Sequence, residues 1–429
     1  MKTYILWYRN DLRVHDHFVL SKAVKEADRF LPVYVFNPDN FRMLKHGFPK
    51  TGYFRLKFLL ESLIDLKASL RKLGSDLHIL TGKPSVVLSE LAAHLNARAI
   101  YASKEHTFEE LRDENELTDM LGETELRFFE DRTLMNPGGT PFSMEKIPEV
   151  FTIFRKASEK NLEHRIKLCL PDPAGLPPLP DGIEINDIPT MGDFPVETPD
   201  VNYFYPDRFL GGETNGLKRF DYYVWESKRV LEYKQTRNGL VGDDYSSKFS
   251  PWLSLGCISP RRIFFELKKF EMAEEGNAST YWLIFELLWR DYFRFVAIKH
   301  GKKIFYKGGL KNIKKSVMRD DRLFDNWKNG ETGISFIDAN MHELNATGYM
   351  SNRGRQVVAN HFVHELQLDW RAGAAYFESQ LIDYDVTSNW CNWMYVGGIG
   401  NDPIEDRRFD IEKQVEMYDP QGIYQMLWK

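Results

Sequence analysis

The chain has 429 residues, a net charge of −5 and 43% hydrophobic residues, which is typical of a globular protein large enough for two or more domains. Its most apolar stretch, starting at Leu283, is broken by Glu286, Arg290, Asp291 and Arg294, so we expect no membrane span. Three widely spaced cysteines and the lack of a signal peptide exclude a disulfide framework and favour a reducing, cytoplasmic location.

The first part of the chain alternates between strand and helix patterns. Short apolar runs at 4–8, 31–36, 76–80, 97–102 and 125–129 predict strands. Helical periodicity runs from Tyr53 to Leu73 and stops before Gly74. Strands separated by helices imply a parallel sheet with right-handed crossovers. The first strand is followed by RNDLR and not by GxGxxG, so we expect a Rossmann-like layout without a Rossmann dinucleotide site.

The composition changes after the predicted sheet. Residues 171–199 are rich in proline and acidic residues with little periodicity, which indicates an extended segment. From about Gly211 the pattern is helical almost throughout, most clearly from Ser279 to His300 before Gly301. The predicted fold class is therefore α/β, with a parallel-sheet domain at 1–132, a long linker at 133–205 and an all-α domain at 206–429.

The first unusual polar segment of the helical part begins at Asp244 and reads DYSSKFSPWLSLGCISPR. Hydroxyls at Ser246, Ser247 and Ser250 surround Lys248 near a helix start, an arrangement that suits phosphate oxygens. Taken alone, the same pattern is more often just a capped helix.

A second segment, FELLWRDYFRF, places Glu286, Trp289, Arg290 and Phe293 on one helix face. A carboxylate, an indole and a guanidinium on an otherwise apolar helix suggest a functional surface. The alternative is an ion pair at the edge of an aromatic core.

A third segment, GYMSNRGRQ from Gly348, places Asn352, Arg355 and Gln356 on one side of a helix beside Arg353. Two arginines and two amides can bind phosphates and base edges, although a solvated basic face would look the same.

The fourth segment, from Asp369 to Asp402, sets three polar side chains among the indoles of Trp370, Trp390 and Trp393. The polar residues are Asp383, Asp385 and Asn389. Buried carboxylates need polar partners, so this is either an aromatic core with helix-capping aspartates or the site of a large redox-active cofactor, for which flavin fits best.

The histidines predict no metal site. His15 and His17 flank Asp16, and His361 and His364 precede Glu365, but neither pair matches a zinc ligand pattern.

With these motifs in order, the chain resembles the photolyase/cryptochrome family from end to end, and most closely its cryptochrome DASH group. The resemblance includes the opening WYRNDLRVHDH, the sequence GGETNGLKRF at Gly211 and the closing YDPQGIYQMLW. Several motifs in the right order carry far more weight than any one of them.

The resemblance implies a folded FAD in the helical domain. The cofactor-binding residues would be Tyr233, Ser246, Ser247, Lys248, Phe249, Ser250, Arg290, Arg355, Asp383, Tyr384, Asp385 and Asn389. Arg355 would pair with Asp383, and Asn389 would face flavin N5, where an amide is the photolyase-like choice.

The resemblance also implies electron transfer through tryptophan. Trp393 matches the residue next to the flavin and Trp370 the middle member of the chain. The position of the family's outer tryptophan holds Val317, and Trp327 is a nearby candidate for that role.

The substrate pocket would open over the flavin and bind an extruded pyrimidine dimer. Its catalytic residues would be Glu286, Trp289, Asn352, Gln356 and Tyr395, with Arg237 and Arg353 on the flanking DNA phosphates. Relatives that act on duplex DNA resemble Met at the Gln356 position and Trp at the Tyr395 position. A smaller aromatic wall should lose duplex activity first, since extrusion from a duplex costs unstacking energy.

The expected antenna is 5,10-methenyltetrahydrofolate in the N-terminal domain. Glu109 matches a folate-binding residue of the family, although Phe108 stands where an asparagine is expected.

We therefore expect a monomeric blue-light flavoenzyme that repairs cyclobutane pyrimidine dimers in single-stranded or locally opened DNA. The alternative is a photosensory protein that binds DNA with little repair and signals to an unknown partner.

Overall fold

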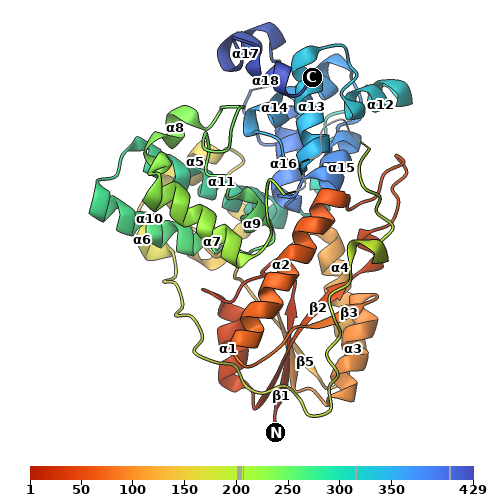
Figure 1. The fold of residues 1–429 in the computed structure, drawn as a ribbon, viewed down its shortest axis with the longest axis vertical. Helices are drawn as coiled ribbons and strands as arrows, with labels where there is room; N and C mark the ends of the chain where they lie inside the picture. Colours follow the sequence, from red (N-terminus) through yellow and green to blue (C-terminus); the bar gives the residue numbers. More distant parts are fainter. Residues whose placement is uncertain (201–204, 206, 315, 405–406) are drawn as a thin grey trace.

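A computed structural model describes the chain except for residues 201–204, 206, 315 and 405–406. It forms an α/β domain and a helical domain, and the helical domain lies beyond the carboxyl ends of the strands (Figure 1). The predicted fold class is confirmed.

The α/β domain is built on five parallel strands in the order β3-β2-β1-β4-β5. They are β1 (Thr3–Tyr8), β2 (Arg29–Phe36), β3 (His78–Thr81), β4 (Ala99–Ser103) and β5 (Glu125–Phe129), so each predicted strand is present with small shifts at its ends. Helices α1 (Phe18–Glu26), α2 (Tyr53–Lys72), α3 (Pro84–His94) and α4 (Phe108–Met120) connect them. Gly74, with φ +85°, follows α2 as the sequence predicted.

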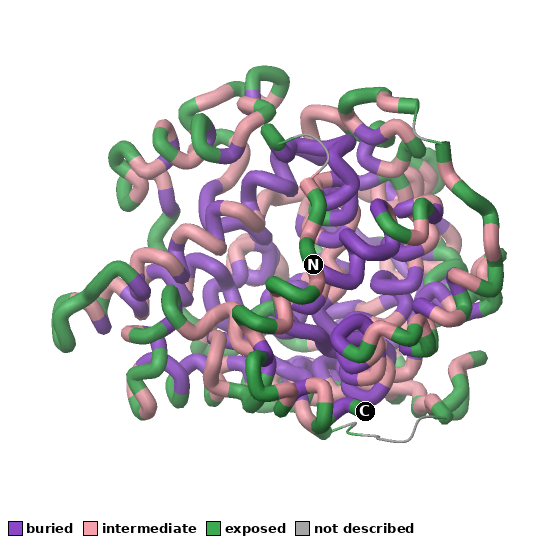
Figure 2. Tube along the Cα trace, turned by 90° about the horizontal axis from the view of Figure 1, so that it is seen from above, coloured by how far each residue is buried: buried purple, intermediate pink, exposed green. Residues whose placement is uncertain are grey.

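The two faces of the sheet have separate cores. Alternate residues Tyr4, Leu6 and Tyr8 of β1 join the large core that continues into the helical domain, whereas Ile5 and Trp7 belong to a smaller core with α3 and α4. Figure 2 shows the buried residues filling the interior, with exposed residues along the outer turns. The larger core therefore holds the two domains together.

The segment predicted as a linker is not entirely extended. It contains α5 (Phe151–Ser158) and α6 (Leu162–Arg165), and the Arg155 guanidinium of α5 donates a hydrogen bond to the Tyr281 hydroxyl of the helical domain at 2.7 Å. The proline-rich stretch that follows runs along the sheet: the Phe30 backbone N–H donates to the Pro178 carbonyl at 3.0 Å, and the Asn186 side-chain amide donates to the Ile79 carbonyl at 2.9 Å.

The helical domain comprises α7 to α18. Their bounds are α7 (Glu213–Asp221), α8 (Tyr233–Thr236), α9 (Ser250–Ser254), α10 (Pro260–Glu274), α11 (Ala278–His300), α12 (Asp321–Asn329), α13 (Ser335–Thr347), α14 (Asn352–Asn360), α15 (Trp370–Gln380), α16 (Val386–Val396), α17 (Ile411–Tyr418) and α18 (Ile423–Leu427). Among the described residues, no helix is long and apolar enough to cross a bilayer, and no group of three or more potential ligands could hold a metal ion.

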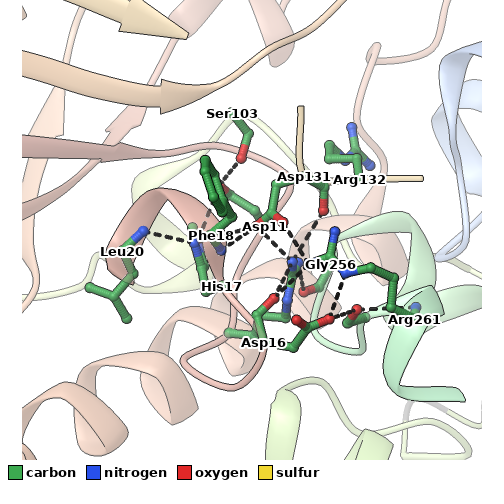
Figure 3. A network of polar contacts seen from close by, with 12 residues as sticks. Asp11, Asp16, His17, Phe18, Leu20, Ser103, Asp131, Arg132, Gly256 and Arg261 are labelled. Atoms are coloured by element: carbon green, nitrogen blue, oxygen red, sulfur yellow. Dashed lines mark hydrogen bonds and ion pairs between the residues drawn. The ribbon is translucent and has the colours of Figure 1, made fainter. Parts of the chain in front are cut away.

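A buried ion-pair network joins the two domains (Figure 3). The Arg13 guanidinium donates to the Asp131 carboxylate at 2.9 Å and to the Gly256 carbonyl at 3.1 Å. Arg261 of α10 donates to Asp131 at 2.7 Å and to Asp16 at 3.0 Å. Each buried charge is thus paired, as burial requires. The opening motif therefore forms the interface between the domains.

Candidate functional site

The predicted cofactor residues line two adjoining cavities. The first, the inner cavity, has a volume of about 260 Å³ and is lined by Tyr233, Ser246, Ser247, Lys248, Phe249, Ser250, Arg290, Arg355, Asp383 and Asp385, among others. The second, the small cavity of about 110 Å³, adds Tyr384, Asn389 and Trp393 and shares Arg355, Asp383 and Asp385 with the first. The fold thus gathers all twelve predicted residues at one place.

The loop before α9 can bind an anion through its backbone. Lys248 has a left-handed φ of +58° and is followed by the right-handed Phe249, a pairing in which successive N–H groups converge on one anion. The Lys248 ammonium lies 3.5 Å from the ring centroid of Tyr245 and 4.5 Å from that of Tyr349. Burial lowers the pKa of Lys248 well below its usual value. The loop therefore offers a phosphate mainly N–H groups and hydroxyls.

Asp383 is the polar centre of the inner cavity. Its Oδ2 accepts hydrogen bonds from Ser250 Oγ at 2.6 Å and from Arg355 at 2.8 Å, which confirms the predicted Arg355–Asp383 pair. Its Oδ1 is buried and has no partner among the described residues. A buried oxygen of this kind calls for a donor, and a ribose hydroxyl or ring N–H of FAD would supply one.

Asp385 is held as an anion beside the same cavity. It caps α16 by accepting the Ser388 amide at 2.9 Å. Burial opposes its ionisation, but Arg290, Arg132 and Arg294 outweigh burial and lower the pKa of Asp385 to about 2. Arg132 and Arg294 were not among the predicted site residues; Arg294 was noted only as a charge that interrupts an apolar run. A fixed positive region suits a cofactor that gains negative charge.

Arg290 contributes to this positive region and also hydrogen-bonds the backbone of two neighbouring segments. Its guanidinium donates to the carbonyls of Arg132 at 2.6 Å and of Leu253 at 3.2 Å. Burial lowers the pKa of Arg290 to about 10. Arg290 thus ties α11 to both the domain boundary and α9.

The predicted substrate residues line a third cavity, the outer cavity, of about 510 Å³. It is lined by Glu286, Trp289, Asn352, Gln356 and Tyr395 and also by Arg237 and Arg353. The inner and outer cavities share Arg237, Glu286, Arg290, Asn352 and Ser388 as a common wall. A ligand in one cavity would therefore lie next to a ligand in the other.

Trp289 presents only one free face to the outer cavity. Its other face is stacked on Phe151 of α5, with ring centroids 3.6 Å apart and planes at 16°. Tyr395 meets Trp289 edge-on at 5.9 Å. No sequence pattern pointed to Phe151, which lies in the segment predicted as a linker.

Two residues with different predicted roles are paired with each other. Arg237, predicted to bind a DNA phosphate, forms an ion pair with Glu286, predicted to bind the bases. Burial raises the pKa of Glu286, although the charge of Arg237 opposes this rise. Arg353 packs over the Tyr418 ring at 4.6 Å. In this structure Glu286 therefore competes with a phosphate for the positive charge of Arg237.

The position of Trp327 overturns its candidacy as the outer, surface tryptophan. Trp327 has no exposed surface, and its indole N–H donates to the Val358 carbonyl at 3.1 Å. It packs against Trp393 at 6.1 Å between ring centroids, so it lies deeper in the core than a surface relay would. Helix α12 is amphipathic and turns this residue inward, where the sequence alone could not place it.

A fourth cavity, the interdomain cavity, of about 550 Å³, lies between the two domains. It is lined by β1 and β2 residues and by Phe108, Glu109, Lys302, Tyr384 and Trp390. This is the carboxyl edge of a parallel sheet, where open α/β sheets bind ligands. Glu109 is ion-paired with Lys50, and the Lys302 ammonium lies 4.1 Å from the Phe108 ring centroid.

Comparison with known proteins agrees with this geometry. Residues 4–177 match the DNA photolyase family and residues 282–428 match the FAD binding domain of DNA photolyase. The chain is 48% identical to the cryptochrome DASH of Gloeobacter violaceus, over all of this chain and 85% of that protein. It superposes on the Synechocystis cryptochrome with a TM-score of 0.95 at 47% identity, covering all of this chain and 88% of that one.

A more distant solved structure shares the architecture. The archaeal photolyase of Sulfolobus tokodaii, solved with two FAD molecules, superposes with a TM-score of 0.80 at 26% identity, over 99% of this chain and 90% of that one. Taken together with the full-length similarity to the curated relatives, this likeness shows that the chain belongs to the photolyase/cryptochrome family, in its cryptochrome DASH group.

Proposed function

We propose that this protein uses blue light and FAD to split cyclobutane pyrimidine dimers in single-stranded or locally opened DNA. The observation that carries the proposal is the wall shared by the inner and outer cavities, which contains Glu286, Arg290 and Asn352. A cofactor on one side of that wall and a dimer on the other would be close enough for direct electron transfer.

Bound FAD would supply one-electron chemistry here: under blue light an electron would pass to the dimer and return once the ring has opened. The residues of the chain bind and orient the two partners. The 246–250 loop and Asp383 would hold the phosphates and the sugar, while Asp385 with its arginines fixes the charge beside the flavin ring. Binding and electrostatics are what a protein adds to cofactor chemistry of this kind.

In the outer cavity Glu286 and Asn352 would hydrogen-bond the pyrimidine edges. Such bonds strengthen as negative charge builds on the dimer, so they favour the transition state over the bound substrate. The free face of Trp289 would stack on one base, and the edge-on Tyr395 would close the pocket. A single stacking face supports the preference for DNA that is already open, since less stacking energy is available to offset extrusion.

We further propose that the interdomain cavity holds the antenna, 5,10-methenyltetrahydrofolate. The cavity reaches from Glu109 to Tyr384 and Asp385, so an antenna bound there would lie close to the inner cavity. We also propose that the protein acts as a monomer.

The experiment that tests the function is blue-light repair of one thymine dimer in single-stranded and in duplex DNA by FAD-loaded protein. We expect repair of the single strand and little repair of the duplex. The variant Glu286→Ala should retain FAD and lose repair. If neither substrate is repaired while FAD is bound and reduced, the photosensory alternative takes the place of repair.

A further inference from the structure

A third tryptophan, Trp390, extends the predicted pair toward the interdomain cavity. Its ring centroid lies 5.6 Å from that of Trp370, with the planes at 78°. Trp370 is almost completely buried, whereas Trp390 is half-buried and lines the interdomain cavity. Trp390 therefore connects the buried Trp370 with a large cavity.

Trp393 packs on the same turn of α15 that carries Trp370. A Cβ atom added to Gly373 would lie 2.3 Å from Cη2 of Trp393, so this indole sits directly against the α15 backbone. Gly373 follows Trp370 by three residues, which is close to one helical turn. Because Trp393 also lines the small cavity, the indoles form a path from there through Trp370 to Trp390.

The three indole N–H groups differ in where a proton could go. Trp393 Nε1 has no partner among the described residues, and Trp370 Nε1 donates to the Lys307 backbone carbonyl at 3.0 Å. Neither environment offers a base. Trp390 Nε1 instead donates to the Tyr384 hydroxyl at 3.2 Å, and Tyr384 and Glu378 both line the interdomain cavity beside Trp390.

Glu378 is well suited to receive a proton. Burial raises the pKa of Glu378, against the opposing charges of Lys50 and Arg55, so its carboxylate is a stronger base than an exposed one. An oxidised indole is far more acidic than a neutral one. A tryptophan that loses both an electron and a proton cannot recover the electron until the proton returns, so charge separation lasts longest at Trp390.

We propose that Trp390 is the terminal electron donor of the tryptophan chain and that Tyr384 and Glu378 accept its indole proton. This inference rests on the proposed light-driven function. Trp393 gives one electron to the photoexcited flavin, Trp370 gives one to Trp393, and Trp390 gives one to Trp370. The Trp390 proton passes to the Tyr384 oxygen as the Tyr384 proton passes to Glu378. A thiol reductant then returns one electron to Trp390, Glu378 returns the proton by the same path, and the thiol proton goes to the solvent.

The test is light-driven reduction of bound FAD with dithiothreitol in the Trp390→Phe variant, together with transient absorption of tryptophan radicals. We expect loss of the long-lived deprotonated indole radical and slower net reduction at equal FAD content. Trp327→Phe is the matched control, because Trp327 also packs against Trp393 but donates only to a backbone carbonyl. That variant should behave as the wild type.

A second variant, Tyr384→Phe, keeps the indole and removes the proton acceptor. The radical should then remain a protonated cation and decay sooner, a spectral change that a purely structural role would not produce. Wild-type radical yield and protonation in both Trp390→Phe and Tyr384→Phe would overturn the inference. Normal photoreduction in Trp393→Phe would instead overturn the tryptophan route of the proposed function, so the two failures are distinct.

Discussion

Replacing Glu286 by glutamine should strengthen binding to undamaged single-stranded DNA while abolishing dimer repair. In the structure Glu286 forms an ion pair with Arg237 through Nη1 and so competes with a phosphate for the positive charge of Arg237. The variant frees Arg237 without removing it. DNA binding should therefore become stronger while dimer repair is lost, although the two would normally be lost together.

The size of the gain follows from the exposure of the pair. The two side chains are 23% and 30% exposed, so the pair is partly screened by solvent. Measured pairs of this kind are worth up to about 1 kcal/mol, which corresponds to an affinity gain of up to about fivefold. Arg237→Ala should act in the opposite sense and reduce the slope of log affinity against log salt by about 0.7, the value for one phosphate contact on a single strand.

The assay is fluorescence anisotropy of a labelled oligothymidine without dimers, titrated at several salt concentrations. Loss of a negative charge could also strengthen binding without involving Arg237, so the double variant Arg237→Ala/Glu286→Gln is needed. In the Arg237→Ala background the Glu286→Gln gain should disappear. An equal gain in both backgrounds, or an unchanged salt slope in Arg237→Ala, would refute the reasoning.

Three further predictions rest on individual contacts. Trp289→Ala should weaken binding of a dimer-containing single strand by about 1–3 kcal/mol, the value of one stacked base. A loss twice as large would mean that a second base replaces Phe151 on the other face of Trp289 and would contradict the single stacking face. Glu109→Ala should release the near-ultraviolet antenna chromophore from purified protein, and a wild type without that chromophore would remove the folate assignment. Burial raises the pKa of Asp291 to about 7. The folded state therefore binds this proton more tightly than the unfolded state does. The resulting contribution of Asp291 to the unfolding free energy is complete below the usual carboxyl pKa and is lost as the pH rises through 7, by at most about 4 kcal/mol. The unfolding free energy of the wild type minus that of Asp291→Asn should therefore decrease over that range, and a constant difference would contradict the raised pKa of Asp291.

The sequence predicted the strands and the longest helices because their signals are local. Alternating apolar runs mark β1 and β2, and a glycine marks the end of α2 and of α11. Most residues of the inner and outer cavities were also predictable, since they lie in short motifs on or just before α9, α11, α14 and α16. Tyr233 of α8 and Arg237 after it were implied only by the resemblance to the family.

The remaining features depend on contacts between distant segments. The stack of Phe151 on Trp289 joins residues from the predicted linker and from α11, and no periodicity reports it. The same holds for the ion pair between Arg132 and Asp385, which are far apart in the sequence. The candidacy of Trp327 as the surface tryptophan was wrong because closeness to Val317 in the sequence does not show whether a helix points that side chain to the surface or into the core.

The buried charges at the domain boundary limit how this protein can be recombined with its relatives. Arg13, Asp16 and Asp131 belong to the sheet half and Arg261 to the helical half, and both carboxylates that pair with Arg261 come from the sheet half. A helical half produced by itself would leave a guanidinium stranded without its counterions. Chimeras should thus exchange the loop at 11–17 and Asp131 together with α10, and crossovers that separate them should yield insoluble protein.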